Sequence, residues 1–182
     1  NYDMGVQGAH YITDKIGNEG TVVILEVPTA GSVSELRKEG FLDTLEEIGA
    51  DFELHTYATQ FTREAGLNDM SDILVRHDQI DAVYSMDDET SIGVVKAIEE
   101  AGREDIKVVT GGGGMQEYFE MMPKYEDIWL QSALYSPAMV KDAVDMALDI
   151  LNGEDVPQEK IIPTTIVDRT NYEEFLDPDS PY

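Results

Sequence analysis

The sequence predicts an α/β fold in which a doubly wound, mostly parallel sheet forms the middle of three layers. Short runs rich in β-branched residues alternate with amphipathic segments over residues 21–134, as in parallel sheets covered by helices on both faces. Residues 83–93 and the glycine run 111–114 then place acidic groups and bare backbone at neighbouring strand ends. Open α/β sheets bind small ligands at that edge, so the pattern predicts a ligand site there.

The first half of the chain predicts two helices and two strands. Residues 5–16 show apolar side chains at helical spacing, and residues 21–27 form the nearly continuous apolar run of a strand covered on both faces. The run 52–57 is more polar, which favours a strand near an edge of the sheet. Between them Ser34 is predicted to cap a helix to about residue 48, with a buried stripe of Leu36, Phe41, Leu42, Leu45 and Ile48.

The second half continues the alternation. Thr62 is predicted to cap a helix that buries Ala65, Leu67, Met70, Ile73 and Leu74. Strands are expected at residues 80–84, 106–110 and 128–134, and an extended stretch at 161–167. Helices are expected at residues 88–101, where Gly102 supplies the C-terminal glycine, at 115–121 and at 137–151.

The charge balance restricts the partners. The chain has 12 Lys and Arg against 38 Asp and Glu, a formal net charge of −26. Such a field repels phosphate backbones and anionic lipids, so the sequence predicts no nucleic-acid partner and no membrane-surface role. An acidic, lysine-poor composition fits work in high salt or outside the cell, and the composition does not choose between these.

Catalytic and metal chemistry have little support in the residues. There is no cysteine, and His10, His55 and His77 are scattered without a helical partner, which argues against a metal site. Ser85, Asp87 and Asp88 cluster without a histidine in sequence reach, so no catalytic residue is assigned and the chain is not expected to be an enzyme. The glycine run lacks the lysine and Ser/Thr of a phosphate-binding loop, and no cofactor is expected.

Several spaced motifs together carry a family resemblance. They are TVVIL at 21–25, RKEGF at 37–41, FTRE at 61–64, IDAVY at 80–84, DD at 87–88 and LNGE at 151–154. In this order they resemble the type I periplasmic sugar-binding proteins of ABC transporters, the ribose-binding group, over the second half of such a protein. The resemblance implies two lobes of flavodoxin-like strand order, joined by three crossing strands, with a sugar between them.

The resemblance also implies a division of the chain. Residues 1–134 would form the carboxy-terminal lobe, residues 135–160 a helix that packs on the amino-terminal lobe missing from this chain, and residues 161–182 the hinge return and tail. The chain starts at Asn1 without an initiator methionine or a basic leader, close to the first crossing, and its start is interpreted as cut.

Five residues match ligand positions of the family. Arg37 matches an arginine that donates to sugar oxygens, and its alternative is a surface arginine paired with Glu35 or Glu39. Phe61 matches an aromatic that stacks on a sugar ring, and its alternative is a core residue. Asp87 matches an Asn or Asp that accepts from hydroxyl groups; alternatively it caps the next helix, unless Asp88 takes the cap.

The other two positions depart from the family. Gly112 stands where the family has aspartate, and Leu134 where it has glutamine, although a shift of the alignment would bring Gln131 or Tyr135 to that place. Losing both polar groups leaves fewer partners for a fully hydroxylated sugar. Backbone N–H groups of the glycine run are the expected substitute.

The predicted function is therefore the solute-binding component of an ABC-type sugar uptake system. Its partners would be a small sugar-like ligand and a membrane permease, and its location periplasmic or extracellular, with lipid anchoring through the missing amino terminus as a further option. The alternative is the effector-binding half of a LacI-type transcription regulator, which shares the fold. A basic DNA-binding head would then have to overcome the charge of −26.

Overall fold

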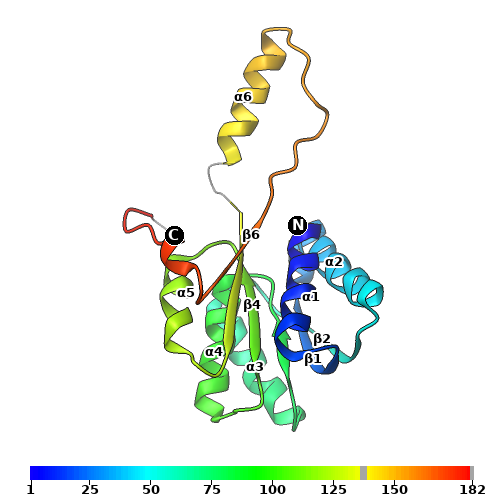
Figure 1. The fold of residues 1–182 in the computed structure, drawn as a ribbon, viewed down its shortest axis with the longest axis vertical. Coiled ribbons are helices and arrows are strands. Elements are labelled where there is room, and N and C mark those ends of the chain that lie inside the picture. Colours follow the sequence, from blue (N-terminus) through cyan, green and yellow to red (C-terminus); the bar gives the residue numbers. More distant parts are fainter. Residues whose placement is uncertain (136–138, 181–182) are drawn as a thin grey trace.

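The computed structural model describes residues 1–135 and 139–180 and has the predicted α/β fold (Figure 1). Within these residues a 6-stranded sheet has the order β2-β1-β3-β4-β5-β6. Strands β1 to β5 pair in parallel, and β6 is antiparallel to β5. The strands are β1 (Glu19–Glu26), β2 (Asp51–Ala58), β3 (Ala82–Tyr84), β4 (Val108–Gly112), β5 (Trp129–Leu134) and β6 (Thr165–Asp168).

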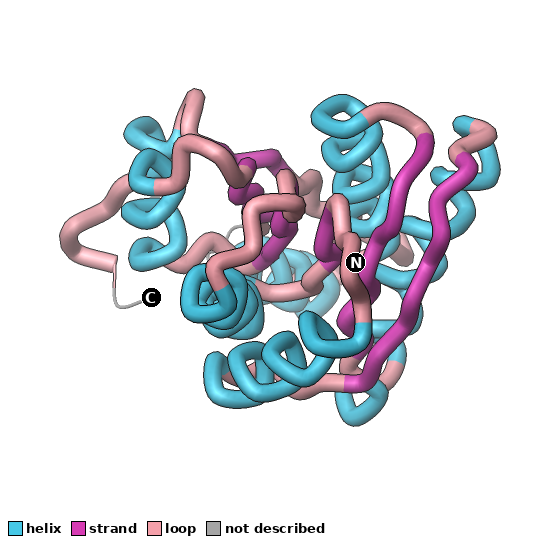
Figure 2. The backbone as a smooth tube through the Cα atoms, turned by 90° about the horizontal axis from the view of Figure 1, so that it is seen from below, coloured by secondary structure: helices cyan, strands magenta, loops and turns pink. Residues whose placement is uncertain are grey.

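Helices cover both faces of the sheet, which makes three layers (Figures 1 and 2). Helices α1 (Tyr2–Ile16) and α2 (Ser32–Ile48) lie on one face. Helices α3 (Arg63–Arg76), α4 (Asp88–Ala101) and α5 (Gln116–Met121) lie on the other. Short 3-10 turns η1 (Pro28–Ala30), η2 (Met122–Lys124) and η3 (Tyr172–Phe175) complete the body.

The inner strands are apolar on both sides because both sides are covered. Val23 and Leu25 of β1 face the cluster beneath α3 and α4, whereas Val22 and Ile24 face the cluster beneath α1 and α2. Strand β2 has no fully buried residue and forms one edge of the sheet, as its polar sequence predicted.

The predicted caps are partly confirmed. Thr62 caps α3 by accepting a hydrogen bond from the Ala65 N–H at 3.2 Å, and Gly102 ends α4 with a left-handed φ of 61°. The Ser34 cap is wrong, because α2 begins at Ser32 after Gly31. Ser34 lies inside the helix, and its Oγ accepts from the Val27 N–H at 2.9 Å.

Two pairs of helices approach each other closely at glycine residues. A Cβ on Gly5 of α1 would lie 2.1 Å from the Arg37 carbonyl oxygen, and one on Gly40 of α2 would lie 2.2 Å from the Tyr2 carbonyl oxygen. Gly66 of α3 and Gly93 of α4 repeat this arrangement against the Thr90 and Arg63 carbonyl oxygens. Backbone can approach so closely only without a side chain.

The crossing with α1 also corrects the predicted stripe of α2. Arg37, Gly40, Phe41 and Thr44 turn toward the interior, which leaves Leu36 38% exposed instead of buried. The close contact of Gly5 and Gly40 with the neighbouring backbone turns Arg37 toward α1, and Leu36, about 100° further round the helix, lies outside that contact.

Helix α6 (Met139–Leu151) extends away from the body (Figure 1) and has no buried residue. Its Asp142 Oδ1 lies 2.5 Å from Nζ of Lys160, which belongs to the segment between α6 and β6. The predicted first residues of this helix, Pro137 and Ala138, lie outside the described residues, as do Pro181 and Tyr182 of the tail. No helix in the described ranges has the length and apolar character needed to cross a membrane.

Candidate ligand-binding site

The five predicted ligand residues lie where the parallel strands have their carboxyl ends, which is called the ligand edge below. Arg37 is near the start of α2, Phe61 lies between β2 and α3, Asp87 precedes α4, and Gly112 and Leu134 end β4 and β5. Each lies at or after the carboxyl end of a parallel strand, where doubly wound sheets place their ligand sites.

Arg37 is held in the interior of this edge. It is 6% exposed, and its Nη1 donates to the Met86 carbonyl oxygen, while its Nε donates to Asn1 Oδ1 at 3.1 Å. No ion pair joins it to Glu35 or Glu39 within the described residues, so the interpretation as a surface arginine is wrong. Two fixed donors orient the planar guanidinium before any ligand binds.

Phe61 lies beside Arg37. The Arg37 Cζ is 5.9 Å from the centroid of the Phe61 ring, within the range of a cation–π contact. The ring is half-buried and packs against the edge of the cluster beneath α1 and α2. Phe61 therefore packs against the core, as its alternative interpretation expected, and part of its side chain remains accessible to solvent.

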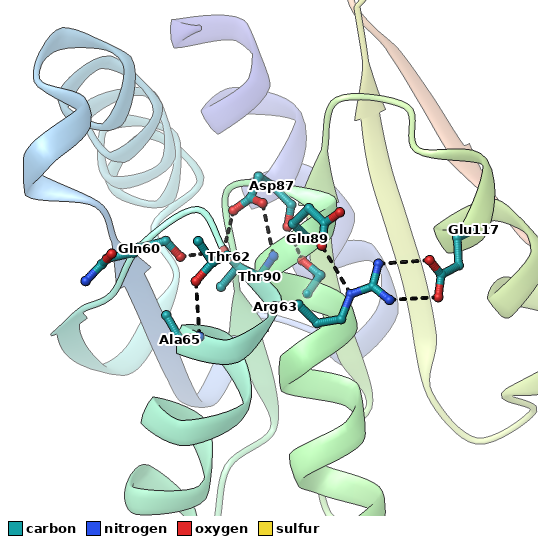
Figure 3. A network of polar contacts seen from close by, with 9 residues as sticks. Gln60, Thr62, Arg63, Ala65, Asp87, Glu89, Thr90 and Glu117 are labelled. Atoms are coloured by element: carbon teal, nitrogen blue, oxygen red, sulfur yellow. Dashed lines mark hydrogen bonds and ion pairs between the residues drawn. The ribbon is translucent and has the colours of Figure 1, made fainter. Parts of the chain in front are cut away.

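Asp87 is the N-cap of α4. Its Oδ1 accepts from the Thr90 N–H at 3.0 Å, and its Oδ2 accepts from the Thr90 hydroxyl (Figure 3). Burial raises the pKa of Asp87, and the hydrogen bonds from Thr90 and the charge of Arg37 oppose that shift. The expectation that Asp88 takes the cap is wrong, so any hydroxyl group of a ligand has to share the Asp87 carboxylate with Thr90.

A neighbouring ion-pair network was not predicted. Arg63 donates from Nη1 and Nη2 to the two Glu117 carboxylate oxygens at 2.9 and 2.8 Å, and from Nε to Glu89 at 3.1 Å (Figure 3). These residues come from the first turns of α3, α4 and α5, and the network joins the three helix ends beside Asp87. Their separation in the sequence gave no signal that they meet.

Gly112 and Leu134 add shape to the site and no polar side chain. A Cβ on Gly112 would lie 2.6 Å from Met4 Cε and 3.0 Å from the Met86 carbonyl oxygen, so α1 and the turn after β3 close over this glycine. Leu134 packs against Gly114. Gln131 is 1% exposed inside β5 and lies in the sheet, whereas Tyr135 reaches the cleft described below.

The glycine run offers fewer backbone donors than expected. The Gly113 N–H donates to the Ala133 carbonyl oxygen at 3.1 Å, and the Gly114 and Met115 N–H groups donate to Asp88 Oδ2 at 2.9 and 2.8 Å. Since these donors are occupied within the chain, the expectation that they bind a ligand is wrong. A carboxylate at the centre of the turn also excludes a phosphate there.

A cleft of about 310 Å³ opens at the same edge. Its walls come from α1, α2 and the two chain segments that lead to and from α6, with Asn1, Met4, Val33, Arg37, Tyr135, Met139, Ile162 and Thr164 as lining residues. Arg37 is the member of the predicted five that lines it. A guanidinium, an amide and two hydroxyl groups stand among apolar side chains, a lining suited to a small polar, uncharged or anionic molecule.

Within residues 1–135 and 139–180, no group of three or more His, Asp or Glu side chains is arranged to hold an ion.

The α/β fold with a cleft at the strand ends is that of a known family of binding proteins. Residues 1–155 match the model of a periplasmic binding protein domain, so the chain belongs to that family. It is 30% identical over 161 residues to the ribose import binding protein of Bacillus subtilis. It is 28% identical over 123 residues to the D-allose-binding periplasmic protein of Escherichia coli.

A solved structure shows the same fold. An ABC transporter periplasmic solute-binding protein of Actinobacillus succinogenes with bound D-allose matches with a TM-score of 0.85 and 24% identity over 95% of this chain. The chain spans 61% of that protein, 50% of the Bacillus relative and 40% of the Escherichia relative. The comparisons therefore show the family and the fold of a part of such proteins.

Proposed function

We propose that this chain is the carboxy-terminal part of the solute-binding component of an ABC-type sugar uptake system. The observation that carries the proposal is Arg37, a buried guanidinium fixed by Met86 and Asn1 at the wall of a cleft and placed beside Phe61. An oriented donor next to an aromatic ring matches a sugar, which presents oxygen acceptors at its rim and an apolar face.

Each predicted residue has a role in this proposal. Arg37 donates to ring and hydroxyl oxygens, Phe61 stacks on the sugar, and Asp87 accepts from a hydroxyl group with the capacity that Thr90 leaves. Gly112 and Leu134 shape the floor. With so few polar groups on this side, discrimination between sugars depends strongly on the opposite wall of the cleft.

The opposite wall would be the amino-terminal lobe. Helix α6 presents Met139, Val140, Val144, Leu148 and Leu151, all exposed, and a partner surface in the same protein would bury them. In this proposal residues 1–134 form the lobe, residues 135–160 pack on the other lobe, and residues 161–182 return to the hinge. Closure on the sugar then produces the form that a membrane permease recognises, in a periplasmic or extracellular location, with or without a lipid anchor.

Sugar binding by variants tests the assignment. Monosaccharides including D-ribose and D-allose are screened against the two-lobe protein by calorimetry, and the tightest ligand is kept. Arg37→Ala is expected to weaken binding about a hundredfold because a charge-assisted donor is lost, and Phe61→Ala about tenfold through lost stacking.

Lys96→Ala, a change of an exposed side chain on α4 away from the strand ends, is the control and is expected to leave the affinity unchanged. Equal affinities for Arg37→Ala and the control would show that this edge of the sheet does not carry the ligand.

A further inference from the structure

Asp88 is a buried carboxylate with three donors on one oxygen. Its Oδ2 accepts from the Gly114 N–H at 2.9 Å, the Met115 N–H at 2.8 Å and the Ser132 hydroxyl at 2.8 Å, and the residue is 0% exposed. These bonds join the first residue of α4 to the turn after β4 and to the middle of β5. One side chain thus fixes the start of α5 relative to the sheet.

The other oxygen of this carboxylate is poorly placed for a charge. Asp88 Oδ1 has no hydrogen-bond partner within the described residues, and it lies 2.4 Å from the position that a Cβ on Gly111 would take. A buried charge without full compensation is unfavourable. Burial raises the pKa of Asp88 to about 6, and the three donors limit that rise.

The turn held by Asp88 forms the floor of the ligand edge. Gly114 packs on Leu134, and Gly112, two residues earlier, has Met4 and the Met86 carbonyl oxygen at 2.6 and 3.0 Å from where a Cβ would lie. The same carbonyl oxygen accepts from Arg37, and Met4 lines the cleft beside it. A displacement of the turn therefore acts on the contacts that orient Arg37.

We propose that Asp88 is a proton-sensitive positioning residue for the cleft. Its ionised carboxylate holds Gly114 and Met115 beside Ser132 of β5, and its protonation weakens that hold and lowers the affinity for the ligand. The hold of Asp88 on the turn follows from its contacts, whereas the effect on ligand affinity rests on the proposed function.

Few ionisable groups face Asp88. Asp87 comes from its own helix and disfavours a second negative charge, and Tyr118 comes from α5. Burial raises the pKa of Tyr118, which therefore stays neutral across the range concerned. Strand β4 contributes Gly111 and β5 contributes Ser132, neither of which is charged. Burial raises the pKa of Asp87 as well, so the loss of the step in Asp88→Asn is what assigns a protonation near pH 6 to Asp88.

Amide resonances of Gly114 and Met115 report the state of the turn without any ligand. In the wild-type protein we expect both to shift with a midpoint near pH 6, and their hydrogen exchange to become about tenfold faster below it, after correction for intrinsic rates. Asp88→Asn is expected to abolish the titration. Asp72→Asn, an exposed change on α3, is expected to leave it intact.

Ser132→Ala separates the proposal from a general loss of structure. It removes one hydroxyl donor and keeps the carboxylate, so the midpoint at Gly114 and Met115 is expected to rise. An unchanged midpoint in Ser132→Ala, or amides that titrate near pH 4, would overturn the role of Asp88 even if Asp88→Asn does not fold.

Ligand affinity is then measured at pH 5 and pH 7.5 with the tightest sugar from the screen. The affinities of the wild-type protein and of Asp72→Asn are both expected to fall about tenfold between pH 7.5 and pH 5, and the affinity of Asp88→Asn is expected to change little. A pH-independent affinity with an intact amide titration would overturn the coupling to the cleft. Absence of sugar binding at both pH values would overturn the proposed function and leave the role in the turn standing.

Discussion

Arg37 shows how one side chain joins the parts of the ligand edge. Its guanidinium contacts Asn1 at the start of the chain and the backbone of Met86 after β3, and Phe61 from the loop after β2 lies beside it. Its own carbonyl oxygen accepts from the Tyr84 hydroxyl at 3.1 Å and lies against Gly5. The residue is fixed at both backbone and side chain, as a preorganised donor requires.

Arg103 has a comparable role at the opposite end of the sheet. Its Nη1 donates to the Leu74 and His77 carbonyl oxygens at 2.9 Å, and Asp105 holds the guanidinium at 2.7 and 2.6 Å. Asp105 also accepts from the Ile80 N–H at 2.8 Å. The Arg103–Asp105 pair therefore fixes the carboxyl end of α3 and the segment that leads from it to β3.

We therefore expect Arg103→Ala to lower the free energy of unfolding by about 2 kcal/mol, since several charge-assisted bonds to carbonyl oxygens are lost. Arg76→Ala, an exposed change on the same helix end, serves as the control and is expected to alter stability by less than about 0.5 kcal/mol. Urea unfolding at pH 7 measures both. Equal effects of the two changes would contradict the role of Arg103.

The same pair predicts a dependence on pH. The hydrogen bond from Arg103 lowers the pKa of Asp105, so the ionised form is favoured in the folded state. Its contribution is present above the ordinary aspartate range near pH 4 and is lost as the pH falls through the lowered pKa. The difference in stability between wild type and Asp105→Asn is expected to shrink from pH 7 to pH 3, and a constant difference would refute this.

Among the helices, the glycine crossings set how closely each pair approaches. A methyl group on Gly93 would lie 2.1 Å from the Arg63 carbonyl oxygen and 2.6 Å from the Leu67 nitrogen, both backbone atoms that cannot rotate away. Because α3 and α4 carry Arg63 and Asp87 to the ligand edge, their separation also sets the geometry of that edge.

Gly93→Ala is expected to destabilise the protein by about 3 kcal/mol, in the range of an overpacked core. Gly49→Ala is the matched control, because Gly49 has a left-handed φ of 74° and nothing near its Cβ position. That change is expected to lower stability by about 1 kcal/mol through backbone strain alone. Thermal unfolding compares them, and a Gly93→Ala effect no larger than that of Gly49→Ala would contradict close packing.

For the whole molecule, the excess of acidic residues is expected to determine how the stability of the fold depends on salt concentration. A net charge of −26 on 182 residues produces strong self-repulsion in the folded chain, and most of the carboxylates lie outside the ion pairs found in the described residues. Screening shortens the reach of that repulsion from about 10 Å in 0.1 M salt to about 3 Å in 1 M salt.

We expect the Tm at pH 7.5 to rise by at least about 5 °C between 0.1 and 1 M NaCl. A scan at pH 4, where most of the charge is neutralised, is the control and is expected to show a much smaller effect. A salt effect of the same size at both pH values would indicate that charge repulsion is not its cause.

The fold was largely predictable, and the reasons lie in particular elements. The β1 run is apolar on both faces and β2 is polar, so a covered strand and an edge strand were predicted and are present. Thr62 and Gly102 signal helix ends through local chemistry, which a sequence displays directly. Ser34 and Leu36 were assigned wrongly because their environment is set by α1 and by Val27, which are remote from the local pattern.

The sequence by itself determined the alternation of strands and helices, the acidic composition and the end of the sheet at which Arg37, Phe61 and Asp87 lie. These features follow from the periodicity of apolar residues, the composition and the order of the motifs. Only the tertiary structure decided that Asp87 caps α4, that Asp88 occupies the donors of the glycine turn, and that Arg63 meets Glu89 and Glu117. The Asp87 cap is local and was one of two sequence alternatives, whereas the Asp88 and Arg63 contacts join residues 26 to 54 positions apart, which packed backbones bring together and no local pattern encodes.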